Sequence, residues 1–261
     1  SLELTTPLEN LKSINLDSTE IKDLSFIKKC PALEKLVLHC TPIADLSILR
    51  DLPTLKSLSL GYMDTLDLPE LPQLEHLDLA EHALESLQDF FHLPSLKGLA
   101  LRQNNLKSLA ELAHFPALEY LDVTNNSIES LEDLPELVQL QTLLLSNFNT
   151  QNYAPLQQRN FPKLSRLQLW NLDNLKRIQH FKALEYLDIS VSEEDYSLLE
   201  TFPQLKQLHL DGLEIEKTNF KEVQLPQLTN LNLNNSQFTD LQFLKNFPQL
   251  KELSLGNLSG S

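Results

Sequence analysis

Cysteine is almost absent from the sequence, which contains only Cys30 and Cys40 among 261 residues. Two cysteines are too few for a disulfide-stapled secreted scaffold, and their spacing is not that of a zinc site. A bond between them is not expected, because they lie at opposite ends of one extended segment. We expect Cys30 to fill the core and Cys40 to be exposed. This scarcity favours a cytosolic or bacterially exported protein over a eukaryotic secreted one.

Glycine is also scarce, and the five glycines stand alone, so that no phosphate-binding loop can be assembled from them. The sequence has no GxSxG, HExxH or CxxC motif. The chain is therefore expected to be non-enzymatic and to need no cofactor.

Positive charge and long apolar runs are limited as well. The 21 Lys and Arg are scattered and are outnumbered by 36 Asp and Glu, which gives a net charge of −15. Such a chain repels a phosphate backbone, so nucleic acid is a poor candidate partner. No apolar run approaches the roughly 18 residues that span a bilayer, and no membrane insertion is expected.

Leucine, by contrast, recurs in the unit Pro-x-Leu-x-x-Leu-x-Leu, as in PALEKLVL (31–38) and PQLKELSL (248–255). The spacing between successive units is between 19 and 24 residues, and most often 22. Small insertions and deletions of this kind are tolerated in the loops of a solenoid. The first leucines of the units are Leu11, Leu33, Leu55, Leu74, Leu96, Leu118, Leu140, Leu164, Leu184, Leu205, Leu228 and Leu250.

Two periodicities alternate within each unit. Leu-x-Leu has a period of two, which predicts a short strand with its leucines facing inward. The residues that follow have a spacing of three, as in Leu106, Leu109, Leu112 and Phe115, which suits a tight helical or 3-10 segment. No single unit can bury its leucines, but about twelve stacked units can.

These motifs resemble the leucine-rich-repeat family, in particular its 22-residue class, which includes a regulatory subunit of protein phosphatase type 1 and the bacterial internalins. The resemblance covers residues 11–258. It implies an α/β solenoid, a superhelix with a concave parallel β-sheet and short helical or 3-10 segments on the convex side. It also implies a protein partner, either in a phosphatase-regulator role or in an internalin-like host-receptor role, without choosing between them.

The repeats depart from the family pattern at the asparagine that hydrogen-bonds the turn after the strand. Only Asn104 and Asn126 match it, so we expect irregular turns or bound waters where it is missing. The residues at this position in the other repeats are Thr19, Thr41, Met63, His82, Phe148, Leu172, Ser192, Leu213 and Ser236.

The repeats define the expected domain organisation. Residues 1–10 are expected to be a cap or partial repeat, and residues 11–258 to be one continuous domain of about twelve repeats. Residues 259–261, Ser-Gly-Ser, resemble an artificial tail. Because the last repeat stops just after its strand, we expect leucines to be exposed there and the natural protein to continue beyond Leu258.

One histidine pattern is a candidate metal site. His92, His114 and His180 share one position of the repeat, and the first two belong to neighbouring repeats. The same position elsewhere holds Lys29, Asp51 and Glu70, which is typical of a solvated column. We therefore expect no metal site.

The outward positions of the strands carry what differs between repeats. Counting from the first leucine of each unit, we call the third, fifth, seventh and eighth residues the strand face. In the central repeats, the only Trp and two of the five Tyr lie there among Asp and Arg, and aromatic and Arg anchors are typical of protein-binding hot spots. The face carries seven acidic residues against Lys35, Arg102 and Arg166, which favours a partner with a basic or mixed-charge surface. The candidate partner-binding residues are His76, Asp78, Arg102, Tyr120, Asp122, Arg166, Trp170, Tyr186, Asp188, His209 and Asp211.

The sequence therefore predicts a protein-recognition module that binds through its concave strand face. An alternative is the recognition or regulatory region of a larger enzyme or receptor, such as a kinase, GTPase, ubiquitin ligase or surface receptor, whose effector domain lies elsewhere. A purely structural spacer or homo-oligomer is a third possibility.

Overall fold

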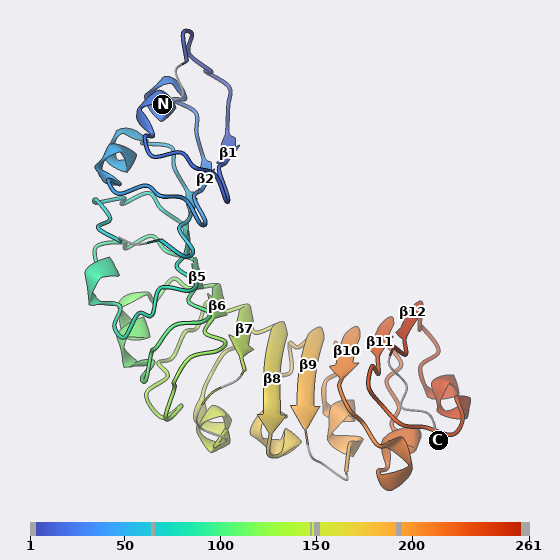
Figure 1. Ribbon diagram of the computed structural model, residues 1–261. Coiled ribbons are helices and arrows are strands. Elements are labelled where there is room, and N and C mark those ends of the chain that lie inside the picture. Colours follow the sequence, from blue (N-terminus) through green and yellow to red (C-terminus); the bar gives the residue numbers. More distant parts are fainter. Residues whose placement is uncertain (1–3, 64–65, 147, 149–151, 192–194, 257–261) are drawn as a thin grey trace. The chain divides into compact units, whose positions relative to one another are not determined.

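The computed structural model describes residues 4–63, 66–146, 148, 152–191 and 195–256. The chain forms two compact units, Ser1–Ser127 and Ile128–Ser261, which we call the N-terminal and C-terminal units (Figure 1). Each unit is a stack of strands connected by loops and 3-10 helices.

In the N-terminal unit, the strands pair in parallel with their sequence neighbours, and residues of adjacent repeats pair in the same register. The strands are β1 (Ser13–Asn15), β2 (Lys35–Val37), β3 (Ser57–Ser59), β4 (His76–Asp78), β5 (Gly98–Ala100) and β6 (Tyr120–Asp122). The 3-10 helices are η1 (Ser25–Lys29), η2 (Ser47–Asp51), η3 (Gln88–Phe90) and η4 (Ala110–His114).

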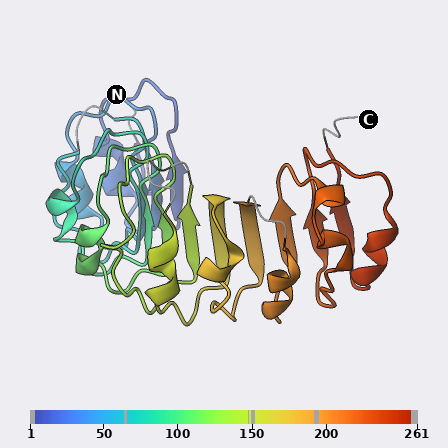
Figure 2. The same cartoon turned by 90° about the horizontal axis from the view of Figure 1, so that it is seen from below.

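The C-terminal unit repeats this arrangement, with its strands side by side and its 3-10 helices in a separate layer (Figures 1 and 2). Its strands are β7 (Thr142–Leu145), β8 (Arg166–Leu172), β9 (Tyr186–Val191), β10 (Gln207–Leu210), β11 (Asn230–Asn232) and β12 (Glu252–Ser254). Its 3-10 helices are η5 (Ala154–Gln158), η6 (Leu175–Arg177), η7 (Ser197–Thr201), η8 (Ile215–Lys217), η9 (Phe220–Glu222) and η10 (Gln242–Asn246).

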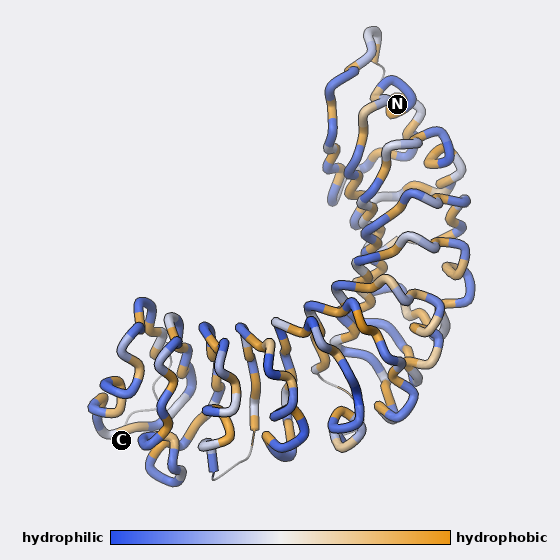
Figure 3. Tube along the Cα trace, turned by 180° about the vertical axis from the view of Figure 1, so that it is seen from behind, coloured by the Kyte–Doolittle hydropathy of each residue, from blue (hydrophilic) through white to orange (hydrophobic). Residues whose placement is uncertain are grey.

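The predicted alternation of leucines and polar residues is confirmed. Leu121, at the centre of β6, and Leu187, the second residue of β9, are both 0% exposed. A one-residue slip would have turned both leucines outward, so their burial fixes the register of the repeats. Figure 3 shows the resulting alternation of hydrophobic and hydrophilic residues along the strands. The solenoid predicted from the leucine pattern is thus present in both units.

The segments with a spacing of three form 3-10 helices, as predicted. Helix η4 falls within the segment that contains Leu106, Leu109, Leu112 and Phe115, and all four side chains are buried. The last repeat is different, because its strand residue Leu253 is 38% exposed. The expectation of exposed leucines in the last repeat is therefore met.

The two matching asparagines hold the turns as expected. The amide of Asn104 donates to the carbonyls of Leu79 and Leu101, at 2.8 and 2.9 Å, and its oxygen accepts from the backbone N–H of Leu84 at 3.0 Å. Asn126 repeats the pattern one repeat later, donating to Leu101 and Val123. Each buried amide thus satisfies backbone groups of two consecutive repeats.

The predicted irregularity is found where leucine replaces this asparagine. Leu172 is buried, strand β8 continues as far as this residue, and the pairing of β8 with β9 shifts register between Leu169 and Leu172. At the same position Ser236 retains one asparagine-like bond, since its Oγ accepts from the backbone N–H of Leu213 at 3.0 Å. The equivalent residue Ser192 lies outside the described residues.

Candidate functional site

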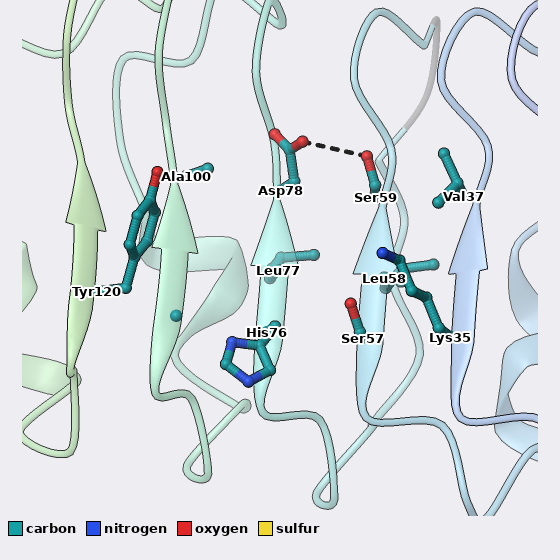
Figure 4. Close-up of a pocket in the computed structure, with 11 residues that line it drawn as sticks. Lys35, Val37, Ser57, Leu58, Ser59, His76, Leu77, Asp78, Ala100 and Tyr120 are labelled. Carbon is teal, nitrogen blue, oxygen red and sulfur yellow. Dashed lines mark hydrogen bonds between the residues drawn. The ribbon is translucent and has the colours of Figure 1, made fainter. Parts of the chain in front are cut away.

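In the N-terminal unit, the strand face carries a hollow of about 310 Å³ between the side chains of neighbouring strands (Figure 4). Lys35 and Tyr120 lie at its two ends, and His76 and Asp78 lie between them on β4. His76 and Tyr120 are exposed, and Asp78 is half-buried. Three predicted site residues, His76, Asp78 and Tyr120, therefore meet at one hollow. Arg102 is exposed outside it.

Two local contacts position β4 side chains. The Asp78 carboxylate accepts from the Ser59 hydroxyl and from the backbone N–H of Ala80, both at 3.1 Å, which holds it between neighbouring strands. The His76 ring lies against Gly98 of the next strand, where a Cβ atom would approach Nδ1 to 2.4 Å. Glycine at position 98 therefore leaves room for the imidazole beside β5.

Asp122 corrects one sequence-based expectation. The sequence predicts a solvent-accessible carboxylate at this position, but Asp122 is only 7% exposed. Its Oδ1 accepts from the backbone N–H of Thr124 at 3.0 Å and from the Thr124 hydroxyl at 2.8 Å. The carboxylate therefore caps the turn after its own strand, as buried polar groups generally require partners. Asp122 has a structural role that the repeat pattern does not indicate.

In the C-terminal unit, Tyr186 is at the centre of a cluster on the strand face. The guanidinium carbon of Arg166 lies 4.1 Å from the centroid of the Tyr186 ring, a cation–π contact. On the other side, the His209 ring meets Tyr186 edge to face at 5.1 Å between centroids, and the Tyr186 hydroxyl lies 3.3 Å from His209 Nδ1. These three predicted site residues thus come together through direct contacts.

Asp188 connects this cluster to Trp170. Its Oδ2 accepts from the Tyr186 hydroxyl at 3.5 Å and lies 3.9 Å from His209 Nδ1, and the indole N–H of Trp170 donates to the carboxylate. Burial raises the pKa of Asp188 above its ordinary value, and these contacts oppose the increase only in part. The raised pKa indicates that the charged form is incompletely compensated.

Trp170 lines a second hollow, of about 500 Å³, on the strand face of the C-terminal unit. The indole is 39% exposed. Asp188, His209 and Asp211 line the same hollow, and Asp211 is exposed, with one carboxylate oxygen accepting from the Asn235 amide at 2.6 Å. All six predicted residues of this unit therefore belong to one continuous group, since Tyr186 contacts Arg166, Asp188 and His209.

Tyr153, which the sequence analysis missed, forms a hydrogen bond to the backbone of Trp170. It comes from the long connection between β7 and β8, is 2% exposed, and donates its hydroxyl to the Trp170 carbonyl oxygen at 2.7 Å. Burial raises the pKa of Tyr153 to about 12, which keeps this donor protonated. The connection is thus tied to the Trp170 backbone, and the indole remains on the strand face.

Small polar residues were also missed. Ser59 lines the N-terminal hollow, and Asn232 and Asn234 line the C-terminal one. All three occupy strand-face columns, so their positions in the repeat were the available signal. Their types gave no reason to rank them above other polar residues.

The residues weighed for other chemistry have ordinary surroundings. Cys30 is buried, Cys40 is exposed, and both are free, as predicted. His114 stacks on Phe91 at 3.7 Å between ring centroids, and His92 Nε2 lies 3.3 Å from the Pro69 carbonyl oxygen. Within the described part of the chain, no three His, Cys, Asp or Glu residues are grouped so as to hold a metal ion.

The surroundings of Asp188 give a testable pH dependence. Because the folded state raises its pKa, deprotonation of Asp188 destabilises the fold as pH rises through its titration, and below its unfolded pKa the effect is absent. Asp188→Asn is therefore expected to raise the melting temperature relative to wild type more at pH 7 than at pH 3. Differential scanning calorimetry at both values measures this, with Asp211→Asn as the exposed control. A difference that does not change with pH would contradict the assignment.

A family model described as leucine-rich repeats (2 copies) matches residues 9–51 and 94–136. No curated protein sequence matches the chain. In the described part of the chain, no helix has the length and apolar character that crossing a bilayer requires.

Several solved structures share the fold. An internalin from Listeria monocytogenes is 20% identical with a TM-score of 0.65, and the match covers 95% of this chain and 81% of that chain. The mouse RP105/MD-1 complex is matched at 18% identity and a TM-score of 0.66, over 97% of this chain and 56% of that one. A TLR13–ssRNA13 complex is matched at 22% identity and a TM-score of 0.62, over 95% of this chain and 43% of that chain.

Proposed function

Because this chain is a leucine-rich-repeat protein, we propose that it is a non-enzymatic protein-recognition module that binds a protein partner through its strand face. The repeat fold is generally a protein-interaction module, and the proteins that carry it recognise unrelated partners. The partner-binding role is therefore argued from the side chains of this chain.

The observation that carries the proposal is the chemistry of the strand face in the C-terminal unit. Arg166, Trp170, Tyr186, Asp188 and His209 form one exposed or half-exposed group, in contrast to the uniform leucine interior. Trp, Tyr and Arg are the residues most enriched in binding hot spots, because they bury large areas and make directional contacts. This combination is typical of a recognition surface.

The repeats also keep these side chains in fixed rows. Parallel strands lie about 4.8 Å apart, so neighbouring repeats present their outward residues at a constant spacing. In β8, β9 and β10, Arg166 is in register with Tyr186, and Tyr186 with Gln207. A surface that is already ordered loses little conformational entropy on binding. Rigid presentation is thus the proposed mechanism of recognition.

Charge indicates the kind of partner. The protein has a net charge of −15, and its strand face carries Asp78, Asp188 and Asp211. A protein surface of basic or mixed charge is complementary to it, whereas a phosphate backbone is repelled. The RNA in the TLR13–ssRNA13 complex is bound by a protein related to this one only in fold. We therefore propose a protein partner over a nucleic acid.

This electrostatic argument predicts a salt-dependent association rate. Exposed charges are screened beyond about 8 Å at physiological ionic strength, so steering of a basic partner weakens as salt is added. The association rate constant, measured by surface plasmon resonance in 50 to 500 mM NaCl, is expected to fall by roughly tenfold or more. The dissociation rate is expected to change less. An association rate that does not respond to salt would point to an uncharged contact.

Partner capture with matched variants tests the proposed function. The wild type and a Tyr186→Ala variant are used as baits, and Gln158→Ala, an exposed residue of η5, is the control outside the strand face. Proteins retained by the wild type and the control but lost with Tyr186→Ala are then purified, and their affinities are measured directly. If all three baits bind the purified partner equally well, the strand face is not the binding surface.

A further inference from the structure

The hollow beside Trp170 combines an exposed aromatic ring with uncompensated negative charge. The indole lies at the rim with 39% exposure, and the Asp188 and Asp211 side chains line the same space of about 500 Å³. The other walls are polar and include Asn232 and Asn234. An indole face is the strongest π-acceptor of cations among protein side chains.

The two carboxylates of the hollow have no strongly basic partner in the part of the chain that the structure describes. Among the described residues, no lysine or arginine forms an ion pair with Asp188 or Asp211. The nearest basic group to Asp188 is His209, at 3.9 Å from Nδ1 to Oδ2. Burial also raises the pKa of Asp188, so that its charged form would gain from an added cation.

The same unit shows how a cation can bind at such a ring. The Arg166 guanidinium stacks over Tyr186, with its central carbon 4.1 Å from the ring centroid. Trp170 lies in the strand of Arg166, four residues further on, and within the described part of the chain no guanidinium or ammonium group is stacked on it. The Trp170 indole is thus available for a cation–π contact like the one that Tyr186 makes with Arg166.

We propose that the hollow beside Trp170 receives an arginine side chain of the protein partner, with the guanidinium stacked on the indole and its N–H groups donating to Asp188 and Asp211. This inference rests on the proposed protein-binding function and specifies the partner's chemistry. Arginine suits the site better than lysine because its planar fork stacks on an aromatic ring and donates to two acceptors at once. The side-chain oxygen of Asn232, which accepts one bond from the backbone N–H of Asn234, is a further acceptor for this five-donor group.

Trp170 is the only tryptophan of the chain, so its fluorescence reports on this hollow alone. Nα-acetyl-arginine amide is titrated into the protein at constant ionic strength, in parallel with Nα-acetyl-citrulline amide, which has a similar shape but no charge. A saturable change in fluorescence is expected with the arginine probe, and at least about tenfold weaker binding with the citrulline probe. Equal responses to both probes, or no saturable response to the arginine probe, would overturn the proposal.

Substitutions identify the carboxylates involved. Asp211→Asn changes an exposed residue and is expected to weaken binding of the arginine probe by about tenfold. Asp188→Asn is expected to weaken its binding as well. Asp78→Asn, in the hollow of the N-terminal unit, is the control and should leave the titration unchanged. Circular dichroism of each variant checks folding, and unchanged binding by folded Asp211→Asn and Asp188→Asn would refute the assignment.

The same variants separate this inference from the proposed function. If the captured partner loses affinity with Tyr186→Ala but binds Asp188→Asn and Asp211→Asn as well as wild type, the strand face binds the partner without an arginine in the hollow. If the arginine probe binds while the Tyr186→Ala bait binds the purified partner normally, the hollow accepts arginine but the strand-face function fails. The two proposals can therefore fail independently.

Discussion

Leu121→Ala is expected to lower the free energy of unfolding by about 2 to 5 kcal/mol, through loss of buried apolar contacts and creation of a cavity. Leu121 is 0% exposed at the centre of β6, where it pairs with Leu99 of β5. Close-packed interiors relax only partly around such a truncation. Chemical denaturation followed by far-ultraviolet circular dichroism measures the change, because the only tryptophan belongs to the other unit.

Leu253→Ala provides the matched control for this substitution. Leu253 occupies the same strand-centre position in β12 but is 38% exposed, so its truncation removes less buried surface. Its cost is expected to be clearly smaller than that of Leu121→Ala. Equal costs at both positions would mean that burial within the stack does not determine the stability of a repeat.

The interior of both units could be predicted because one rule decides it. A period of two places Leu121 inward and Tyr120 outward, and the spacing of three in the return segments leaves one apolar side that must be covered. Repetition removes the ambiguity of short apolar runs, since the same pattern recurs with each unit. The parallel order of the strands follows, because each repeat covers only its neighbours.

The candidate site was less predictable, because exposure depends on how neighbouring side chains close over a position. Asp122 and Asp188 have equivalent positions in their repeats. The Asp122 carboxylate accepts hydrogen bonds from Thr124 in the turn after its strand, whereas Asp188 lines a hollow. Tyr153 lies in a connection that is longer than in the other repeats, so its role could not be inferred from equivalent residues in those repeats. The residue types in the strand-face columns identified the binding surface, but only the structure showed which of its residues contact one another.

Trp170→Ala is expected to weaken binding of the protein partner by at least about 2 kcal/mol, or roughly 30-fold in Kd, while leaving the fold intact. The indole is 39% exposed on the strand face, so its removal takes away contact area available to a partner. Isothermal titration calorimetry with the purified partner measures the loss. Val138→Ala, at an apolar residue that is 44% exposed and lies outside the strand face, is the control and should leave the affinity unchanged.

The competing role for Trp170 is to cover the long connection at residues 149–161 as part of a small apolar core. The structure instead ties Tyr153 of this connection to the Trp170 carbonyl oxygen, a contact that an alanine at position 170 retains. The melting temperature of Trp170→Ala should therefore stay close to that of wild type, whereas Tyr153→Phe, which removes the buried donor, should destabilise by about 1 to 3 kcal/mol. A large loss of stability in Trp170→Ala, with unchanged affinity of the folded protein, would assign the indole to the core and not to recognition.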